Sequence, residues 1–233
     1  MIEIVREAAT AQEIENLRLD GGTTLAAFYL HHRESEDLDF FCDPPFNAVA
    51  FGEAVQEHAR AAGIEITSMG RANLSISRLL ARNHDRPGQQ VKIDLVLQSP
   101  FRLEPLDDTE NGIQIPSYRD ICAGKLHAVC DRFAERDFID LHVILTQPHG
   151  GSPASDDVIC QRFEALMRDL KECDPGLDPP YVGQAIMQGL GRPIVSAFPL
   201  RLLIPIDEAA LQHTLDLCVN DCARRTQHAA PSE

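Results

Sequence analysis

Two aspartates one residue apart, Asp37 and Asp39, are the residues of this sequence best suited to chemistry. Alternate side chains of a β-strand share a face, so on a strand the two carboxylates lie together while Leu38 and Phe40 face away. Neighbouring carboxylates repel and raise each other's proton affinity unless a cation lies between them. Proteins bind Mg²⁺ through one or two carboxylates together with substrate phosphates. The pair therefore predicts a magnesium site that takes a phosphorylated substrate.

A glycine pair lies upstream of these aspartates, where a short apolar stretch meets an apolar, helix-like run. Because glycine has no side chain, Gly21 and Gly22 allow backbone N–H groups to approach a ligand closely. N–H groups at the start of a helix are suited to binding phosphate. Followed by Thr23, this turn predicts a cradle for a polyphosphate. Together with the aspartate pair it predicts a metal–nucleotide site.

A third carboxylate, Asp94, lies in a strand-like stretch that begins at Lys92. Lys92 and Asp94 share one face of that strand, and an acid there is costly to bury unless it is paired. Two interpretations stay open. The stretch is an edge strand with a Lys/Asp ladder, or Asp94 joins Asp37 and Asp39 as a metal ligand or as the base for an incoming nucleophile.

Charged residues recur at helical spacing between 125 and 141. Lys125, Arg132 and Arg136 fall near one stripe, and Asp137 and Asp140 are about one helical turn apart. In one interpretation Lys125 reaches a polyphosphate and an acid steadies it. In the other, the charges form a network that holds two helices together.

Histidine and cysteine offer weaker candidates for metal ligands. His31 and His32 lie near the carboxylates and could add ligands, although a histidine pair in a loop is more often only solvated. Cys218 and Cys222 lie on one expected helix without a second ligand cluster, so we expect them to be core thiols.

The elements that position these residues follow from the hydrophobic pattern. The first part of the chain mixes strands and helices, which predicts an α/β or α+β sheet domain over 1–116, and the rest predicts a helical domain over 117–233. Strands are expected at 17–20, 37–42, 64–67, 73–80, 91–97 and 113–116. Helices are expected at 9–16, 24–31, 48–62, 118–133, 135–145, 156–171, 181–190 and 207–226. The second helix is expected to be buried, and Val49, Phe51, Val55 and Ala59 are expected on or near one side of the third.

Composition limits the function classes. The 233 residues carry a formal net charge of −15, which argues against broad, non-specific binding to nucleic acid. A local basic groove stays open as an alternative to charges that only balance nearby acids, and its residues would be Arg71, Arg78, Arg82, Arg86 and Lys92.

Membrane insertion and secretion are not expected. The sequence has no apolar run of about 18 residues, and its N-terminus lacks the form of a secretory signal. Seven cysteines without a CxxC pair argue against a disulfide framework, so a reducing cytoplasm is the expected compartment.

Four motifs in order resemble the nucleotidyltransferase AbiEii/AbiGii toxin family, a branch of the DNA-polymerase-β-like nucleotidyltransferase superfamily. The resemblance runs from about Leu19 to Leu141, more than half of the chain. Its residues are Gly21-Gly22-Thr23, then Arg33, Ser35 and Asp37-Leu38-Asp39-Phe40-Phe41, then Lys92-Ile93-Asp94-Leu95, and finally Lys125-Leu126-His127-Ala128 with Arg136-Asp137-Phe138-Ile139-Asp140-Leu141.

The resemblance implies a role for each motif in a polymerase-β-like fold with a helical C-terminal region. Gly21, Gly22 and Thr23 would contact the triphosphate of an NTP, and Arg33 and Ser35 would flank that triphosphate. The other roles are these: Asp37 and Asp39 would hold Mg²⁺, Lys125 would bind phosphate, and Asp137 or Asp140 would reach the nucleotide.

The function implied is transfer of an NMP from an NTP to an acceptor hydroxyl. By resemblance the protein would be the toxin of a type IV toxin–antitoxin pair, with tRNA as acceptor and a cognate antitoxin as partner. Two alternatives stay open. One is transfer to a small aminoglycoside-like molecule, which the acidic charge favours. The other is a nucleotide-binding partner protein without catalysis.

Overall fold

The computed structural model describes residues 1–35, 37–43, 45–69, 76–83, 90–98, 102–190 and 200–229, with the side chains of 228 and 229 left out. The chain forms two units. The first comprises Met1–Tyr29 and Ser35–Ser117, and the second comprises Leu30–Glu34 and Tyr118–Glu233. The chain therefore enters the second unit briefly, between the glycine pair and the aspartate pair, before it returns to the first.

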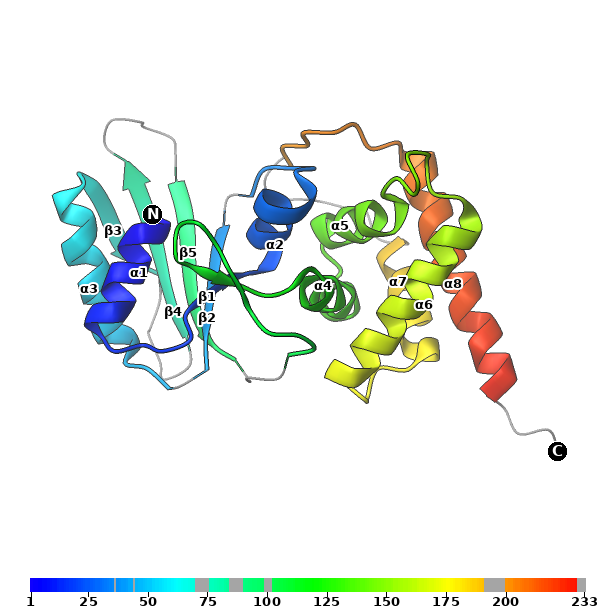
Figure 1. Cartoon of the computed structure of the whole chain (residues 1–233), viewed down its shortest axis with the longest axis horizontal. Helices are drawn as coiled ribbons and strands as arrows, with labels where there is room; N and C mark the ends of the chain where they lie inside the picture. Colours follow the sequence, from blue (N-terminus) through cyan, green and yellow to red (C-terminus); the bar gives the residue numbers. More distant parts are fainter. Residues whose placement is uncertain are drawn as a thin grey trace. The chain divides into compact units, whose positions relative to one another are not determined.

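A mixed sheet forms the centre of the first unit (Figure 1). Its described strands follow the order β3-β4-β5-β2-β1-β7-β6, in which β2 pairs with β1 antiparallel and with β5 parallel. The strands are β1 (Arg18–Asp20), β2 (Asp37–Cys42), β3 (Ile64–Ser68), β4 (Ile76–Asn83), β5 (Gln90–Leu97), β6 (Asp107–Asp108) and β7 (Gln114–Ile115).

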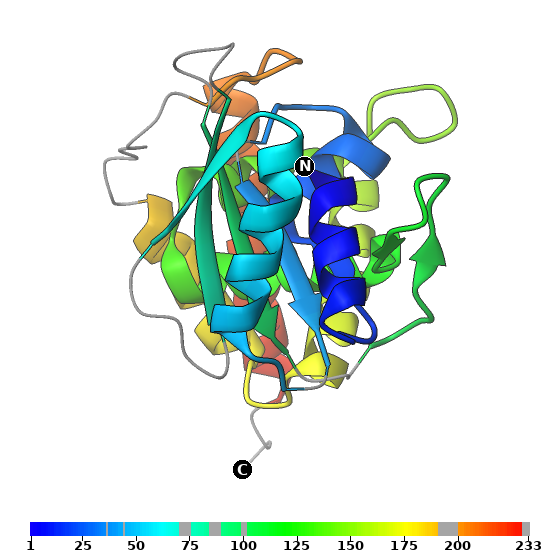
Figure 2. The same ribbon diagram turned by 90° about the vertical axis from the view of Figure 1, so that its left-hand side faces the viewer.

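Two helices, α1 (Ile2–Ala11) and α3 (Ala48–Ala61), lie side by side over one face of this sheet (Figure 2). Fully buried side chains such as Phe51 of α3, Phe40 of β2 and Leu95 of β5 form the core between the helices and the sheet. The glycine pair begins the short helix α2 (Gly21–Thr24), which continues as the π-helical segment η1 (Leu25–Leu30). One face of the sheet is therefore apolar and covered by α1 and α3, so polar side chains of β2 and β5 belong to the other.

Several expectations for the first unit were wrong in detail. The first helix spans Ile2–Ala11 and not 9–16, because Val5, Ala8 and Ala9 form the stripe that packs into the core. Val49 is 57% exposed, since the buried stripe of α3 runs through Phe51, Val55 and Ala59.

The buried helix expected at 24–31 begins earlier, at Gly21, and is buried at Thr24, Leu25 and Ala26 but exposed at Ala27. The strand expected at 73–80 is β4, although residues 73–75 lie outside the described part of the chain. The edge-strand interpretation of Asp94 was also wrong, because β5 lies between β4 and β2.

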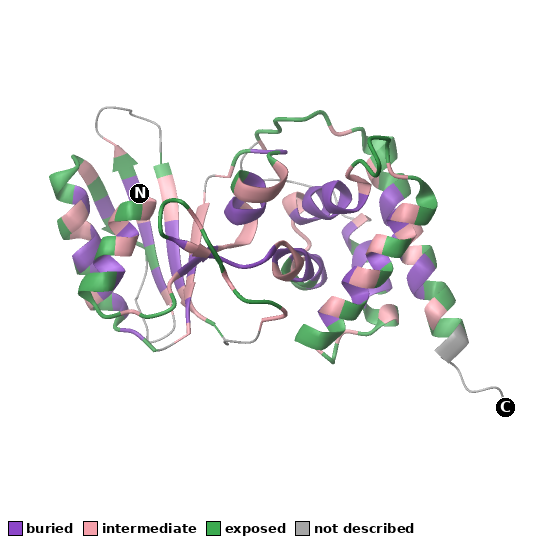
Figure 3. Cartoon of the chain, viewed as in Figure 1, coloured by how far each residue is buried: buried purple, intermediate pink, exposed green. Residues whose placement is uncertain are grey.

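Helices form the second unit, as the sequence predicted. They are α4 (Tyr118–Arg132), α5 (Glu135–Thr146), α6 (Asp156–Cys173), α7 (Pro179–Leu190) and α8 (Glu208–Ala229). Helix α5 is buried along most of its length (Figure 3). Cys218 and Cys222 are 1% and 2% exposed, so the prediction of core thiols is confirmed. Among the described helices, none combines the length and apolar character that crossing a membrane requires.

Candidate functional site

Carboxylates form a row across three adjacent strands of the first unit. Asp39 of β2 is the register partner of Asp20 on β1 and of Asp94 on β5. Register partners on neighbouring strands project to the same face, and Asp37 shares that face with Asp39. Because Leu19, Phe40 and Leu95 form the adjoining row in the core, the acidic row lies on the face opposite α1 and α3.

Asp94 is buried and only partly neutralised. Its residue is 6% exposed, and its Oδ2 lies 2.8 Å from Lys92 Nζ and 3.6 Å from Arg78 Nε. Its Oδ1 is buried and has no hydrogen-bond partner among the residues that the structure describes. A buried carboxylate oxygen without a donor is costly, and a cation or a water molecule would satisfy it.

The glycine turn approaches the acidic row closely. Gly21 has φ of +71°, and a Cβ at that position would lie 2.8 Å from Asp39 Oδ2. Only glycine fits here without strain, because the backbone is left-handed and a carboxylate occupies the space of a side chain. The two motifs that the sequence predicted to act together are therefore in contact within one unit.

Hydroxyl groups join this turn to the start of β2. Thr23 Oγ1 donates to the backbone carbonyl of Asp37 and lies 2.8 Å from Ser35 Oγ. Asp20 accepts a hydrogen bond from the backbone N–H of Gly21 and so caps α2. In this geometry Thr23 and Ser35 position the turn against the strand, whereas the family resemblance implied that Thr23 contacts the triphosphate and that Ser35 flanks it.

The residues of this row fit a bound Mg²⁺. Among the described residues no group of three or more His, Cys, Asp and Glu side chains is arranged to hold a metal. Mg²⁺ needs no such protein cage, because one or two carboxylates and the oxygens of a phosphate suffice. The orphaned Oδ1 of Asp94 beside Asp39 is the observation that favours a cation there.

A second cluster of charges lies within the helical unit. Lys125 of α4 is 3% exposed, and its Nζ lies 3.3 Å from Asp137 Oδ1 and 2.8 Å from Asp140 Oδ2 on α5. Arg132 Nε donates to Asp137 Oδ2 over 2.7 Å. These contacts form a charge network between α4 and α5, which is one of the two interpretations that the sequence left open. They hold Lys125 among acids and favour that interpretation over direct phosphate binding.

Asp140 also forms hydrogen bonds with two residues of the short segment Leu30–Glu34. Arg33 donates to both of its carboxylate oxygens, over 2.7 and 2.8 Å, and His32 Nε2 lies 2.6 Å from Oδ1. Burial alone would raise the pKa of Asp140, but the hydrogen bonds from Arg33 and His32 and the charge of Lys125 hold it far below its usual value. Asp140 is therefore ionised at any ordinary pH.

His32 differs from the expectation of a solvated loop histidine. It is completely buried, whereas His31 is exposed. The expectation was wrong for His32 because its partner Asp140 is 108 positions away in the sequence, on helix α5, so the residues around His32 give no sign of the contact. Among the described residues, His32 belongs to no cluster of side chains that could hold a metal ion.

The sequence did not predict Asp20 as part of the site. It placed Arg78 and Lys92 in a possible basic groove, with charge balance as the alternative. Asp20 could have been found, since it directly precedes a glycine pair at the start of a helix and is a preferred capping residue. Arg78 and Lys92 balance Asp94, as the alternative to the groove supposed. Arg71 and Arg86 lie outside the described residues.

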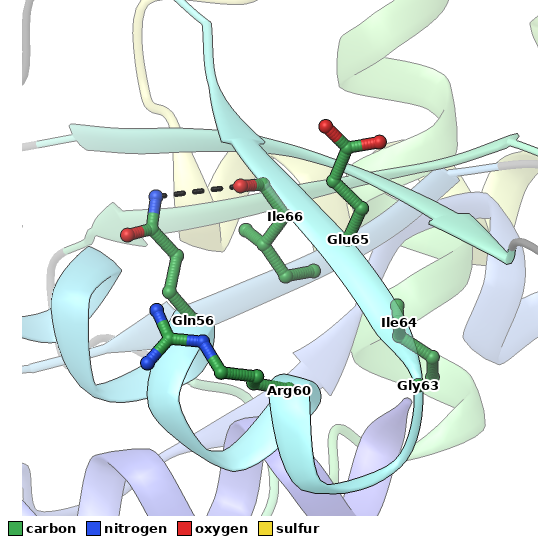
Figure 4. A pocket seen from close by; sticks show the side chains of 6 residues that line it. All are labelled: Gln56, Arg60, Gly63, Ile64, Glu65 and Ile66. Atoms are coloured by element: carbon green, nitrogen blue, oxygen red, sulfur yellow. Dashed lines mark hydrogen bonds between the residues drawn. The ribbon is translucent and has the colours of Figure 1, made fainter.

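A pocket of about 400 Å³ lies elsewhere on the first unit, between α3 and the edge strand β3 (Figure 4). Its lining residues are Gln56, Arg60, Gly63, Ile64, Glu65 and Ile66. None of the candidate residues lines it. The acidic row, and not this pocket, is therefore the candidate site.

Solved structures share this fold. MenT4, a nucleotidyltransferase toxin of Mycobacterium tuberculosis, matches with a TM-score of 0.57 and 16% identity over 95% of this chain and 81% of that chain. JHP933 from Helicobacter pylori matches with a TM-score of 0.52 and 18% identity over 97% of this chain and 92% of that one. At these identities the likeness shows the fold alone, which is that of the nucleotidyltransferases. A search of curated protein sequences found no match.

The family is shown by the sequence itself. The family model described as "Nucleotidyl transferase AbiEii toxin, Type IV TA system" matches residues 3–216. The chain belongs to this family of nucleotidyltransferase toxins, as its four motifs predicted. It is an enzyme of the nucleotidyltransferase class.

Proposed function

We propose that this protein is a Mg²⁺-dependent enzyme that transfers an NMP from an NTP to a hydroxyl group of tRNA. It would be the toxin of a type IV toxin–antitoxin pair with a cognate antitoxin. The observation that carries the chemistry is the contact between the glycine turn and the acidic row. Gly21 approaches Asp39 so closely that no side chain fits, and Asp94 presents an unpaired buried oxygen beside it.

In this proposal Asp37 and Asp39 hold the ion, and Gly21 and Gly22 present backbone N–H groups to the triphosphate. Bound Mg²⁺ would offset negative charge on the phosphates. The acceptor oxygen forms a new bond to the α-phosphorus, the bond from that phosphorus to the bridging oxygen breaks, and pyrophosphate leaves with the electron pair. Asp94 Oδ1 accepts the proton of the acceptor hydroxyl.

The second unit has a supporting role in this proposal. Lys125 and Asp137 are engaged with each other and with their neighbours on α4 and α5. If Lys125 binds the phosphate, as the family resemblance implies, it has to leave two carboxylates first. A loss of charge at Lys125 would then affect folding as well as turnover.

A small cationic acceptor is a second candidate. The formal net charge of −15 favours a positively charged substrate such as an aminoglycoside, because an acidic protein attracts cations and repels polyanions. The tRNA acceptor is supported by the family resemblance, and the small acceptor by charge.

Incubating the protein with each α-³²P-labelled NTP and Mg²⁺ tests both, with total tRNA in one series and an aminoglycoside panel in the other. We expect label on tRNA, and a loss of at least about 100-fold in Asp39→Asn, the size typical of removing one preorganised electrostatic contact. Asp156→Asn is the control, since this exposed acid of α6 forms an ion pair with His213 and, among the described residues, with no other cation. Chelating the metal should stop transfer.

Each result decides between the candidates. Label on an aminoglycoside but not on tRNA would replace the proposed acceptor. Mg²⁺–NTP binding by calorimetry without pyrophosphate release under any condition would identify a nucleotide-binding protein without catalysis.

A further inference from the structure

The segment Leu30–Glu34 leaves the sheet unit and is held in the helical unit. It follows the glycine turn and precedes the acidic strand, so both motifs of the proposed site are continuous with it in the chain. On its helical side, His32 and Arg33 bind Asp140. On its sheet side, Ser35 contacts Thr23 of the glycine turn.

Backbone pairing holds the same segment from another direction. Leu203 N donates to His32 O over 2.9 Å, and Glu34 N donates to Arg201 O over 2.8 Å. Arg33 and Leu202 form an isolated antiparallel bridge. The segment is thus fixed by a side-chain cluster and by a strand-like pairing, both within the second unit.

We propose that Asp140 is a positioning residue that acts through Arg33 and His32, and not a ligand of the nucleotide. Its carboxylate is completely buried and is met by His32 Nε2, by Nε and Nη2 of Arg33 and by Lys125 Nζ. A carboxylate has about four acceptor positions, so these donors saturate it. A carboxylate without free acceptor positions can neither coordinate a metal ion nor accept a hydrogen bond from the ribose or base of a nucleotide.

Asp140 affects the proposed site through the covalent continuity of the chain around Arg33. Asp140 fixes Arg33, and Ser35 follows two residues later, so it stays within roughly 7 Å of the fixed backbone because one residue spans at most about 3.6 Å. Fixing Arg33 restricts Ser35 and Asp37, and the contact of Ser35 with Thr23 carries the restriction to the glycine turn. Releasing Arg33 is expected to loosen the register between the turn and the acidic strand.

A double-mutant cycle tests this inference, which rests on the proposed function for its kinetic readout. The variants are Arg33→Lys, which keeps the charge but loses the two-pronged contact, Asp140→Asn, and the two combined. We expect kcat to fall about 10-fold or more in each single variant, with KM for the NTP within about 2-fold of wild type. The double variant should lose no more than the worse single one.

The opposite pattern would overturn the inference. If Asp140 bound the nucleotide, KM would rise in Asp140→Asn but not in Arg33→Lys, and the losses in kcat/KM would multiply in the double variant. Should Asp140→Asn fail to fold, kcat of Arg33→Lys still decides: a fall of about 10-fold supports positioning, and an unchanged kcat refutes it.

Thr214→Val is the matched control for lost packing in the helical unit. Thr214 is 1% exposed and its Oγ1 lies 2.9 Å from Nδ1 of His142, which follows Asp140 on α5. The valine removes this hydrogen bond and the one from Thr214 Oγ1 to the backbone carbonyl of Ala210, and neither involves the segment Leu30–Glu34, so we expect lower stability and unchanged kcat. A fall in kcat like that of Arg33→Lys would mean that general destabilisation explains the effect, and would refute positioning.

Hydrogen exchange separates this inference from the proposed function. Amides of β2 should exchange faster in Arg33→Lys and Asp140→Asn than in wild type, but not in Thr214→Val. Faster exchange in both variants, together with a wild-type protein that transfers no nucleotide, would refute the proposed function and leave the coupling standing. Unchanged exchange in both variants would sink the coupling.

Discussion

Replacing Gly21 with alanine tests the contact on which the candidate site depends. The backbone of Gly21 is left-handed, at φ +71°, which costs a residue with a Cβ about 1–2 kcal/mol. The new Cβ would also lie 2.8 Å from Asp39 Oδ2 and 3.3 Å from Asp39 Cβ, so the aspartate has to move. A misplacement of about 1 Å at a reacting centre costs roughly 100-fold in rate.

Gly63→Ala is the matched control. Gly63 has nearly the same backbone, at φ +69°, but a Cβ there meets nothing within 4 Å. Gly63→Ala should lose about 1 kcal/mol of unfolding free energy, because the left-handed cost is partly offset by the lower entropy of the unfolded chain. Gly21→Ala should lose at least as much, because Asp39 also has to move. Urea denaturation measures that loss, and transfer of label from an α-³²P-labelled NTP measures the activity.

Only Gly21→Ala should lose activity, by about 100-fold, while Gly63→Ala keeps it. Wild-type activity in both variants would mean that the approach of the turn to Asp39 has no part in the reaction. Equal loss in both would mean that reduced stability, and not the displaced carboxylate, is responsible.

Two further outcomes are expected. Asp137 and Asp140 have lowered pKa values in the folded protein, so their stabilisation is complete above the unfolded-state pKa near 3.9 and is lost as pH falls through the folded values. The gap in urea midpoint between wild type and Asp140→Asn should be constant from about pH 7 to 5 and shrink below about pH 4, and a gap that widens in acid would contradict this. Gly189→Ala should lose about 1–3 kcal/mol, since its Cβ would overlap the ring of buried Phe138. Gly124→Ala should gain up to about 1 kcal/mol, because Gly124 is an exposed position of α4 where a Cβ meets nothing within 4 Å. Thermal unfolding of the pair checks the sign, and two losses of similar size would refute it.

Local periodicity was enough to predict much of this molecule. The strand with Asp37 and Asp39, the shared face of Lys92 and Asp94, and the turn at Gly21 each depend on residues a few positions apart. The amphipathic pattern likewise predicted the helices of the second unit to within a few residues.

Contacts across long stretches of sequence could not be predicted in the same way. The partnership of Asp20 with Asp39 depends on the register between two strands, which a single strand does not encode. The burial of His32 depends on Asp140, a residue 108 positions away. The phase of α3 was misjudged at Val49 because neighbouring apolar positions compete for the same face.

Because the segment Leu30–Glu34 belongs to the helical unit, cutting the chain at one point cannot separate this enzyme into its two units. A fragment ending at Ser117 would contain every described strand, yet Arg33 would lose the carboxylate that neutralises it and His32 would lose its hydrogen-bond partner. The complementary fragment would keep Asp140 with fewer counter-charges, and an uncompensated charge in an interior is strongly destabilising. Exchange of either half between relatives by recombination is therefore disfavoured, and the two units are expected to evolve as one piece.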